Sequence, residues 1–287
     1  MLRGYLELLR PANVMTAVAD VLAGYAVAGL RNPRALPWLI GSTACLYAGG
    51  VVLNDYFDRH LDARERPERP LPSGRVAPRA AALLGGGLLL GGIGLASLAT
   101  PVAGLIASAI TGAVLLYDSR GKRHRVFGPL NMGACRGLNL LLGMAAVPAA
   151  IVGGWPLALI PLVYIAAVTG VSRGEVHGGN RGTATLALIS LGGVIVALAA
   201  LSARAGAGRI GGLAITVLLA WRVLPPFWRV REDPAPARVR QAVKAGVLSL
   251  VLVDATLGAT YGGPLYGAVV LTTAVAAAGL ARLFSVT

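Results

Sequence analysis

Residues 36–74 read L-P-W-L-I-G-S-T-A-C-L-Y-A-G-G-V-V-L-N-D-Y-F-D-R-H-L-D-A-R-E-R-P-E-R-P-L-P-S-G, an apolar run that ends in an acidic motif. The apolar part is long enough to cross a bilayer as a helix. Three carboxylates follow at Asp55, Asp58 and Asp62. At a turn of about 100° per residue they share an arc of roughly 60° on one helix face. Because like charges on one face repel, the pattern predicts that cations neutralise them.

Two interpretations of this acidic motif stand side by side. Carboxylate oxygens with gaps between them suit Mg²⁺, which takes one or two carboxylates together with substrate phosphates and water. The alternative is an acidic helix end that lies in water just beyond a membrane span. The preceding Asn54 and the segment that follows, rich in Arg, Pro and Gly, favour the metal site.

The composition predicts an integral, multi-pass membrane protein. The 287 residues are 56% hydrophobic and 13% charged, whereas soluble domains have about a quarter charged residues. We expect an all-α polytopic bundle of nine or ten transmembrane helices that forms a single domain over residues 1–287. No removable signal peptide is predicted. The expected spans are about 12–30, 36–57, 80–99, 101–117, 136–152, 155–171, 184–203, 208–228, 241–259 and 264–284.

The net charge of +14 is carried by the segments between apolar spans. With no interleaved aromatic platform, this distribution argues against a nucleic-acid partner. The bias of Lys and Arg places the N-terminus and the polar segments in the cytoplasm, and we expect a bacterial plasma membrane. All polar motifs then share one face and converge on a central cavity that opens there. The opposite face carries only Arg31, Arg34, Arg204 and Arg209.

Two more polar segments follow the acidic motif. Residues 117–139 are read as a basic loop, which suits either a diphosphate or lipid headgroups. Its cations are Arg120, Lys122, Arg123, Arg125 and Arg136. Residues 171–186 form a glycine-rich loop with Glu175 and His177.

Ionisable residues also lie inside two apolar spans. Asp20 is expected to face the bundle interior or a cavity or, equally, to lock two helices as a hydrogen-bonded acid, and Asp254 lies in the span at 241–259. Cys45 and Cys135 have no neighbours at metal-binding spacing and give no zinc or disulfide signal.

The motifs together resemble those of the UbiA superfamily of intramembrane prenyltransferases. N-D-Y-F-D-R-H-L-D at residues 54–62 is similar to that family's N-D-x-x-D-x-x-x-D motif, and R-P-L-P-S-G at 69–74 resembles its R-P-[LI]-x-x-G loop. R-P-A-N at 10–13 and the Y-x-x-x-x-K-R pattern at 117–123 are also similar. The resemblance extends from residue 10 to about residue 245.

The resemblance implies Mg²⁺-dependent transfer of a prenyl group from a polyprenyl diphosphate to a small acceptor, within membrane lipid. The catalytic residues it implies are Asp55, Asp58, Asp62, Glu175 and His177, and Asp55, Asp58, Asp62 and Glu175 would bind the metal. The diphosphate contacts it implies are Asn54, Arg59, Arg69, Tyr117, Lys122, Arg123 and Arg181.

The chain departs from the family at the second acidic motif. That motif is a pair of aspartates four residues apart, whereas residues 171–182 contain only Glu175 as an acid. Glu175 then ligates a single metal with His177 as ligand or base, or the second metal is absent, or Arg173 and Arg181 neutralise the diphosphate. This departure suggests a divergent branch, and R-E-R-P-E-R-P-L-P-S-G-R-V at residues 64–76 with E-V-H-G-G at 175–179 resembles the EboC-like proteins of the family.

Three other functions remain open at this point. A non-catalytic protein that binds lipid diphosphates would keep the first motif without turnover. A membrane terpene cyclase on the same scaffold would need no acceptor. A transporter using Asp20 and Asp254 as ion sites is less favoured, because the polar residues gather on one face. The sequence does not identify the acceptor or the prenyl chain length.

Overall fold

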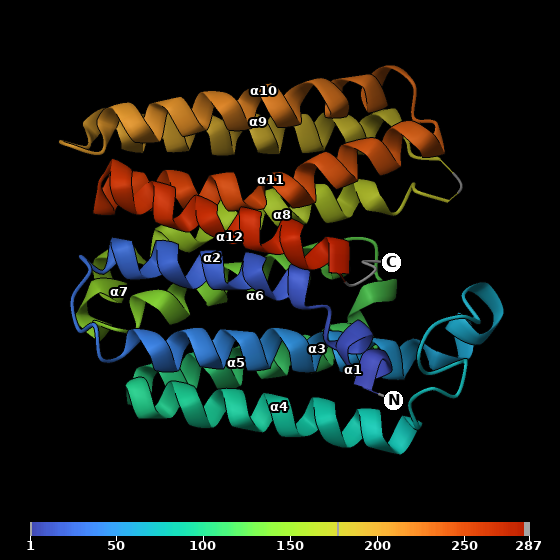
Figure 1. The fold of residues 1–287 in the computed structure, drawn as a ribbon. Coiled ribbons are helices and arrows are strands. Elements are labelled where there is room, and N and C mark those ends of the chain that lie inside the picture. Colours follow the sequence, from blue (N-terminus) through green and yellow to red (C-terminus); the bar gives the residue numbers. More distant parts are fainter. Residues whose placement is uncertain (1, 177, 284–287) are drawn as a thin grey trace.

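The computed structural model describes residues 2–176 and 178–283, and the side chains of all of these except residues 2, 123 and 283. The described chain is helical, with no strand (Figure 1). The helices are α1 Leu2–Leu9, α2 Pro11–Val27, α3 Leu36–Glu65, α4 Pro78–Ala99, α5 Pro101–Ser119, η1 Gly121–Arg123, α6 Phe127–Met144, α7 Pro148–Gly154, η2 Trp155–Ala158, α8 Leu159–Ser172, α9 Arg181–Arg204, α10 Arg209–Glu232, α11 Pro236–Gly262 and α12 Pro264–Leu283.

Local sequence accounts for where many of these helices begin. Proline occupies the first turn of α2, α4, α5, α11 and α12, where its missing N–H breaks no helical hydrogen bond. The side-chain oxygen of Thr100 caps α5 by accepting from the Ala103 amide at 3.1 Å. Asn180 caps α9 by accepting from the Thr183 amide at 2.7 Å.

Eight described helical segments are long and apolar enough to cross a membrane, which confirms the multi-pass prediction. They are α3, α4, α5, the broken segment Pro148–Ser172, α9, α10, α11 and α12. Two further helices lie within the bundle and are not among these eight. Helix α2 has only 17 residues, and the apolar sequence of α6 is interrupted by Asn131, Arg136 and Asn139.

The centre of the bundle is formed by α2, α6 and α11, between α3–α5 on one side and α8–α10 on the other (Figure 1). Residues 17–26 of α2 and 249–259 of α11 are buried without interruption, so neither helix keeps a lipid-facing stripe there. α12 packs against both of these helices, and its Tyr266 hydroxyl donates to the Leu22 carbonyl at 3.0 Å.

Glycines let α2 and α6 approach until their backbones touch. A Cβ atom at Gly143 would lie 2.2 Å from the Val21 carbonyl oxygen, and one at Gly24 would lie 2.0 Å from the Leu140 carbonyl oxygen. Small residues at such contacts are typical of helix packing in membranes. The close approach brings the polar side chains of α6 within reach of α2.

The prediction that residues 117–139 form one basic loop was wrong. Helix α6 begins at Phe127, nine residues before the expected start of the span at 136. Arg136 therefore lies inside the bundle and not in a loop. The glycine and polar content of this segment suggested a loop, but its polar side chains are satisfied by neighbouring helices.

The segments that join the helices at one end of the bundle carry the sequence motifs. The connecting residues 66–77, 120–126, 173–176, 178–180 and 233–235 all lie at the end where α1 and the last turn of α12 are found (Figure 1, right). We call this the motif end. The prediction that these segments share one face is therefore confirmed.

Candidate active site

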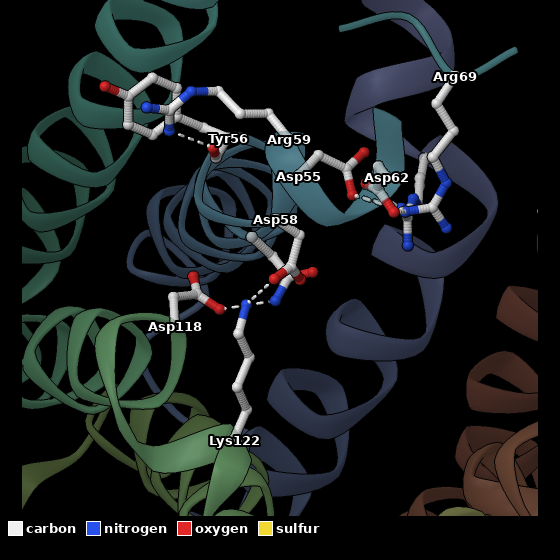
Figure 2. Close-up of polar contacts among 10 residues, drawn as sticks. Asp55, Tyr56, Asp58, Arg59, Asp62, Arg69, Asp118 and Lys122 are labelled. Atoms are coloured by element: carbon white, nitrogen blue, oxygen red, sulfur yellow. Dashed lines mark hydrogen bonds and ion pairs between the residues drawn. The ribbon is translucent and has the colours of Figure 1, made fainter. Parts of the chain in front are cut away.

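The acidic motif on α3 is neutralised by cations from separate parts of the chain (Figure 2). Arg10 Nη2, at the junction of α1 and α2, donates to Asp55 Oδ1 at 2.7 Å. Arg69 Nη1 donates to both Asp62 oxygens, at 3.0 and 2.8 Å, and lies 3.7 Å from Asp55 Oδ1. Asp55 and Asp62 are both buried, so these pairs remove charges that would be costly to leave alone.

The middle carboxylate of the motif faces the segment after α5. Lys122, in η1, donates from Nζ to Asp58 Oδ1. Asp118, near the end of α5, accepts from Asn54 Nδ2 at 2.8 Å through Oδ1. Its Oδ2 atom is buried and has no hydrogen-bond partner among the described residues. Figure 2 shows Asp118 and Lys122 on the side of α3 where Asp58 projects.

Asp118 and Arg10 are site residues that the sequence prediction did not assign. Asp118 was seen only as the single acid of a basic loop, and Arg10 only as part of the R-P-A-N motif. The sequence signal that could have identified Asp118 was its position next to Tyr117 at the end of an apolar span.

Arg10 adopts a backbone conformation that favours glycine. Its φ and ψ angles are 44° and 61°, in the left-handed region, and it directly precedes Pro11. Such a conformation costs about 1–3 kcal/mol for a non-glycine residue and clusters at functional sites. Here it places the guanidinium on Asp55.

A cavity of about 340 Å³ lies below these ion pairs, between α2, α3, α5, α6, α8 and α11. Arg10, Asn54, Tyr117 and Asp118 line it at the motif end, and its walls are largely apolar. The apolar lining residues include Leu46, Val51, Ile110, Val114, Met132, Ile165, Val168, Val247 and Leu250.

Deeper in the same cavity, a second polar group is built around Arg136 of α6. Its guanidinium donates to Asp20 Oδ2 and to Thr16 Oγ1, both at 2.9 Å, and lies over the ring of Tyr47 at 5.1 Å from the centroid. Asn139 Nδ2 also donates to Asp20 Oδ2, at 2.9 Å. Tyr47, Arg136 and Asn139 line the cavity, and we call these three residues the cavity floor.

Asp20 and Asp254, predicted to sit in separate spans, meet behind this floor. Both side chains are fully buried, and the Asp254 carboxyl lies within hydrogen-bonding reach of the Asp20 carboxyl. No amide, hydroxyl or guanidinium among the described residues donates to either oxygen of Asp254. The pair joins α2 to α11.

Two of the predicted diphosphate contacts point elsewhere in this structure. Arg59 stacks on Tyr56 at 4.4 Å from the ring centroid and donates to its carbonyl, on the far side of α3 from Lys122 (Figure 2). Arg181 donates to the Glu232 carbonyl at 3.4 Å, at the end of α10.

Glu175 lies in the turn that follows α8. Arg240 donates to its backbone carbonyl at 3.0 Å, and Arg66 and Arg240 face its carboxylate. Burial raises the pKa of Glu175 above its usual value, and the two arginines oppose that shift. His177 and the side chain of Arg123, both predicted site residues, lie outside the described residues.

The donor chemistry at the mouth of the cavity fits Mg²⁺ held jointly with a diphosphate. Within the described parts of the chain, no three His, Cys, Asp or Glu side chains converge on one point. Mg²⁺ needs only one or two carboxylates when substrate phosphates and water complete its shell. The buried, unpartnered Asp118 Oδ2 and the partly exposed Asp58 are hard oxygen donors on the same side of α3.

Two known proteins with similar sequences share one name, digeranylgeranylglyceryl phosphate synthase. The chain is 36% identical over 146 residues to digeranylgeranylglyceryl phosphate synthase of Methanopyrus kandleri, a match that covers 50% of this chain and 53% of that protein. It is 38% identical over 149 residues to the Methanothrix thermoacetophila protein of the same name, covering 51% and 56%. The chain thus spans about half the length of these curated relatives.

Solved structures show the same fold at low sequence identity. A structure of digeranylgeranylglyceryl phosphate synthase superposes with a TM-score of 0.67 at 20% identity, over 92% of this chain and 98% of that one. A UbiA homolog from Archaeoglobus fulgidus bound to GPP and Mg²⁺ gives a TM-score of 0.53 at 16% identity, over 96% and 99%.

The family model agrees with the motifs and with the fold. The UbiA prenyltransferase family model matches residues 14–173, more than half of the chain. This range contains α3 with its acidic motif, the Arg69 loop, Asp118 and Lys122. The chain belongs to the UbiA prenyltransferase family.

Proposed function

We propose that this protein transfers a prenyl group from a prenyl diphosphate to a small acceptor within the membrane. The observation that carries the proposal is the arrangement of Asp58, Asp118, Lys122 and Arg10 at the mouth of an apolar cavity. Cations and hard oxygen donors there suit a diphosphate with Mg²⁺, and the apolar walls suit an isoprenoid chain. The curated relatives carry the name of such a synthase.

The transfer balances without any further reactant. The bond between C1 of the prenyl group and the diphosphate oxygen breaks, and C1 forms a new bond to the acceptor. The acceptor's proton passes to an oxygen of the departing diphosphate. Lys122 and Arg10 stabilise the charge that builds on the diphosphate, and the apolar walls keep water from the allylic cation.

Mg²⁺ is the implied cofactor of this site. We propose that Asp58 and Asp118 hold it together with the diphosphate, while Asp55 and Asp62 keep Arg10 and Arg69 in place. When bound, the metal neutralises diphosphate charge and so favours departure of the leaving group. That Asp55, Asp62 and Glu175 also ligate metal stays a prediction.

The proposal also covers the domain organisation of the chain and its orientation in the membrane. We propose that residues 1–287 act as one domain, with the motif end in the cytoplasm and the spans in a plasma membrane. The excess of Lys and Arg at the motif end supports this orientation.

The test is to replace the two groups that face each other at the mouth. Asp58→Asn and Lys122→Gln should each lower Mg²⁺-dependent diphosphate release from geranylgeranyl diphosphate by about 10²-fold, with the melting temperature preserved. Glu65→Gln is the matched control, because Glu65 is an exposed acid at the end of the same helix and should not change the rate. Full activity in both site variants would contradict the proposal.

One observation favours a second candidate, a protein that binds lipid diphosphates without turnover. The described part of the loop after α8 supplies only Glu175, which faces Arg66 and Arg240 and forms no cluster with the α3 carboxylates. Tight, Mg²⁺-dependent binding of geranylgeranyl diphosphate without release of diphosphate across a panel of acceptors would establish this candidate.

A further inference from the structure

Polar groups line the cavity at two levels. Asn54 and Asp118 lie at the mouth, and Tyr47 and Arg136 lie at the floor. Tyr47 precedes Asn54 by seven residues on α3, which at 1.5 Å per residue separates the two levels by roughly 10 Å along the helix. Apolar side chains occupy the wall between them. The mouth is used by the proposed diphosphate site, and the floor has no role in it.

Burial of Arg136 costs more free energy than a purely structural role would explain. An arginine inside a membrane must be desolvated, and buried ion pairs are often no more stabilising than apolar residues of similar size. Its guanidinium has five N–H groups, of which two donate to Asp20 and Thr16. Its side chain keeps 13% of its surface exposed, and the residue lines the cavity.

The groups behind the floor decide what charge a ligand there can carry. Asp20 holds Arg136, and the Asp254 carboxyl meets the Asp20 carboxyl with no donor from another described residue. The group formed by Asp20, Asp254 and Arg136 thus contains two carboxyl groups and only one guanidinium, so it offers no excess of positive charge to an anion. A neutral oxygen-bearing group therefore suits the floor better than a phosphate or carboxylate.

We propose that the cavity floor binds the hydroxyl group of a neutral alcohol acceptor, with Arg136 as the donor to its oxygen. This inference rests on the proposed function, and it specifies the acceptor's chemical class. Asp20 and Asp254 are positioning residues that hold the guanidinium against Tyr47. With the diphosphate at the mouth, the bond between C1 and the diphosphate oxygen breaks, C1 bonds to the hydroxyl oxygen as an ether, and the hydroxyl proton passes to an oxygen of the released diphosphate.

The experiment measures acceptor binding separately from catalysis. Detergent-solubilised protein is titrated with geranylgeranylglycerol, a neutral alcohol, and with geranylgeranylglyceryl phosphate, which carries the same lipid on a phosphate. Both titrations are run with and without Mg²⁺ and a non-reactive thio analogue of geranylgeranyl diphosphate. The variants are Arg136→Lys, which keeps the ion pair with Asp20, and the double variant Arg136→Gln with Asp20→Asn, which removes both charges. Arg204→Gln, at an exposed arginine ending α9, is the matched control.

The expected result is that the wild type and the control bind geranylgeranylglycerol more tightly than its phosphate. Both floor variants should bind the neutral lipid about tenfold more weakly or worse, with analogue affinity unchanged. Equal binding of the neutral lipid by the wild type and a folded floor variant, preference of the wild type for the phosphate, or binding of neither lipid would overturn the inference. Failure of the wild type to bind the analogue would contradict the proposed function instead, and the titrations without analogue would still test the floor.

Discussion

Each acidic side chain of the α3 motif is matched to a basic partner from another segment. Asp55 pairs with Arg10, Asp58 pairs with Lys122, and Asp62 pairs with Arg69. A diphosphate would compete for the same cations, so its binding exchanges one set of ion pairs for another. Lys122 is the cation best placed for this exchange, because its partner Asp58 is the most exposed carboxylate of the three.

Arg10 offers a test that separates backbone strain from function. Arg10→Gly removes the guanidinium from Asp55 and relieves the left-handed conformation, so the melting temperature should be kept or raised while affinity for geranylgeranyl diphosphate falls about tenfold. Leu30→Gly is the matched control, because Leu30 has φ 57° at the opposite end of α2. It should relieve strain without changing affinity. An unchanged affinity in Arg10→Gly would show that Arg10 does not contact the diphosphate.

At the scale of the element, α6 supplies the polar side chains of the cavity floor. One end of it carries Asn131 and follows Lys122, its middle carries Arg136 and Asn139, and its far end packs on α2 through Gly143. The sequence prediction missed this helix start because polar residues and glycines indicate a loop in isolation. Only the neighbouring helices supply the partners that make these residues tolerable in a membrane.

Adding a methyl group where α2 meets α6 should disrupt the floor. Gly143→Ala would place a Cβ 2.2 Å from the Val21 carbonyl oxygen, so the helices must separate, at a cost of about 1–3 kcal/mol. Gly94→Ala on α4 is the control, since nothing lies within 4 Å of its Cβ position, and it should leave stability equal or higher. Thermal unfolding in detergent measures both. Equal melting temperatures for the two variants would argue against the close contact.

At the scale of the whole molecule, the sequence predicted the fold class and the convergence of the motifs at one end. Hydropathy and basic-residue bias depend on composition along the chain, and so they can be read without a structure. The sequence predicted that ion pairs would form, because three carboxylates on one helix face require cations. It did not predict which basic residues would supply them. Arg10, Lys122 and Arg69 reach α3 through loop geometry that no periodicity encodes.

The interior contacts were the least predictable part of the site. The sequence suggested a buried role for Asp20 and placed Asp254 in another span, but the contact between them depends on how α2 and α11 are rotated about their axes. Arg136 was assigned to a loop for the reason given above, and Arg59 was assigned to the diphosphate although it shares a helix face with Tyr56 in the fold. The spacing of residues along a helix determines which of them share a face. Which other helix packs against that face is determined by the tertiary structure.

The most direct measurement is a cryo-electron microscopy structure of the protein with Mg²⁺ and a non-reactive thio analogue of geranylgeranyl diphosphate. We expect diphosphate density at the cavity mouth between α3 and η1, with Lys122 moved from Asp58 to the diphosphate, Mg²⁺ on Asp58 and Asp118, and the prenyl chain in the apolar cavity. Diphosphate bound away from α3, or a cavity mouth whose ion pairs stay as they are when the analogue is bound, would contradict it.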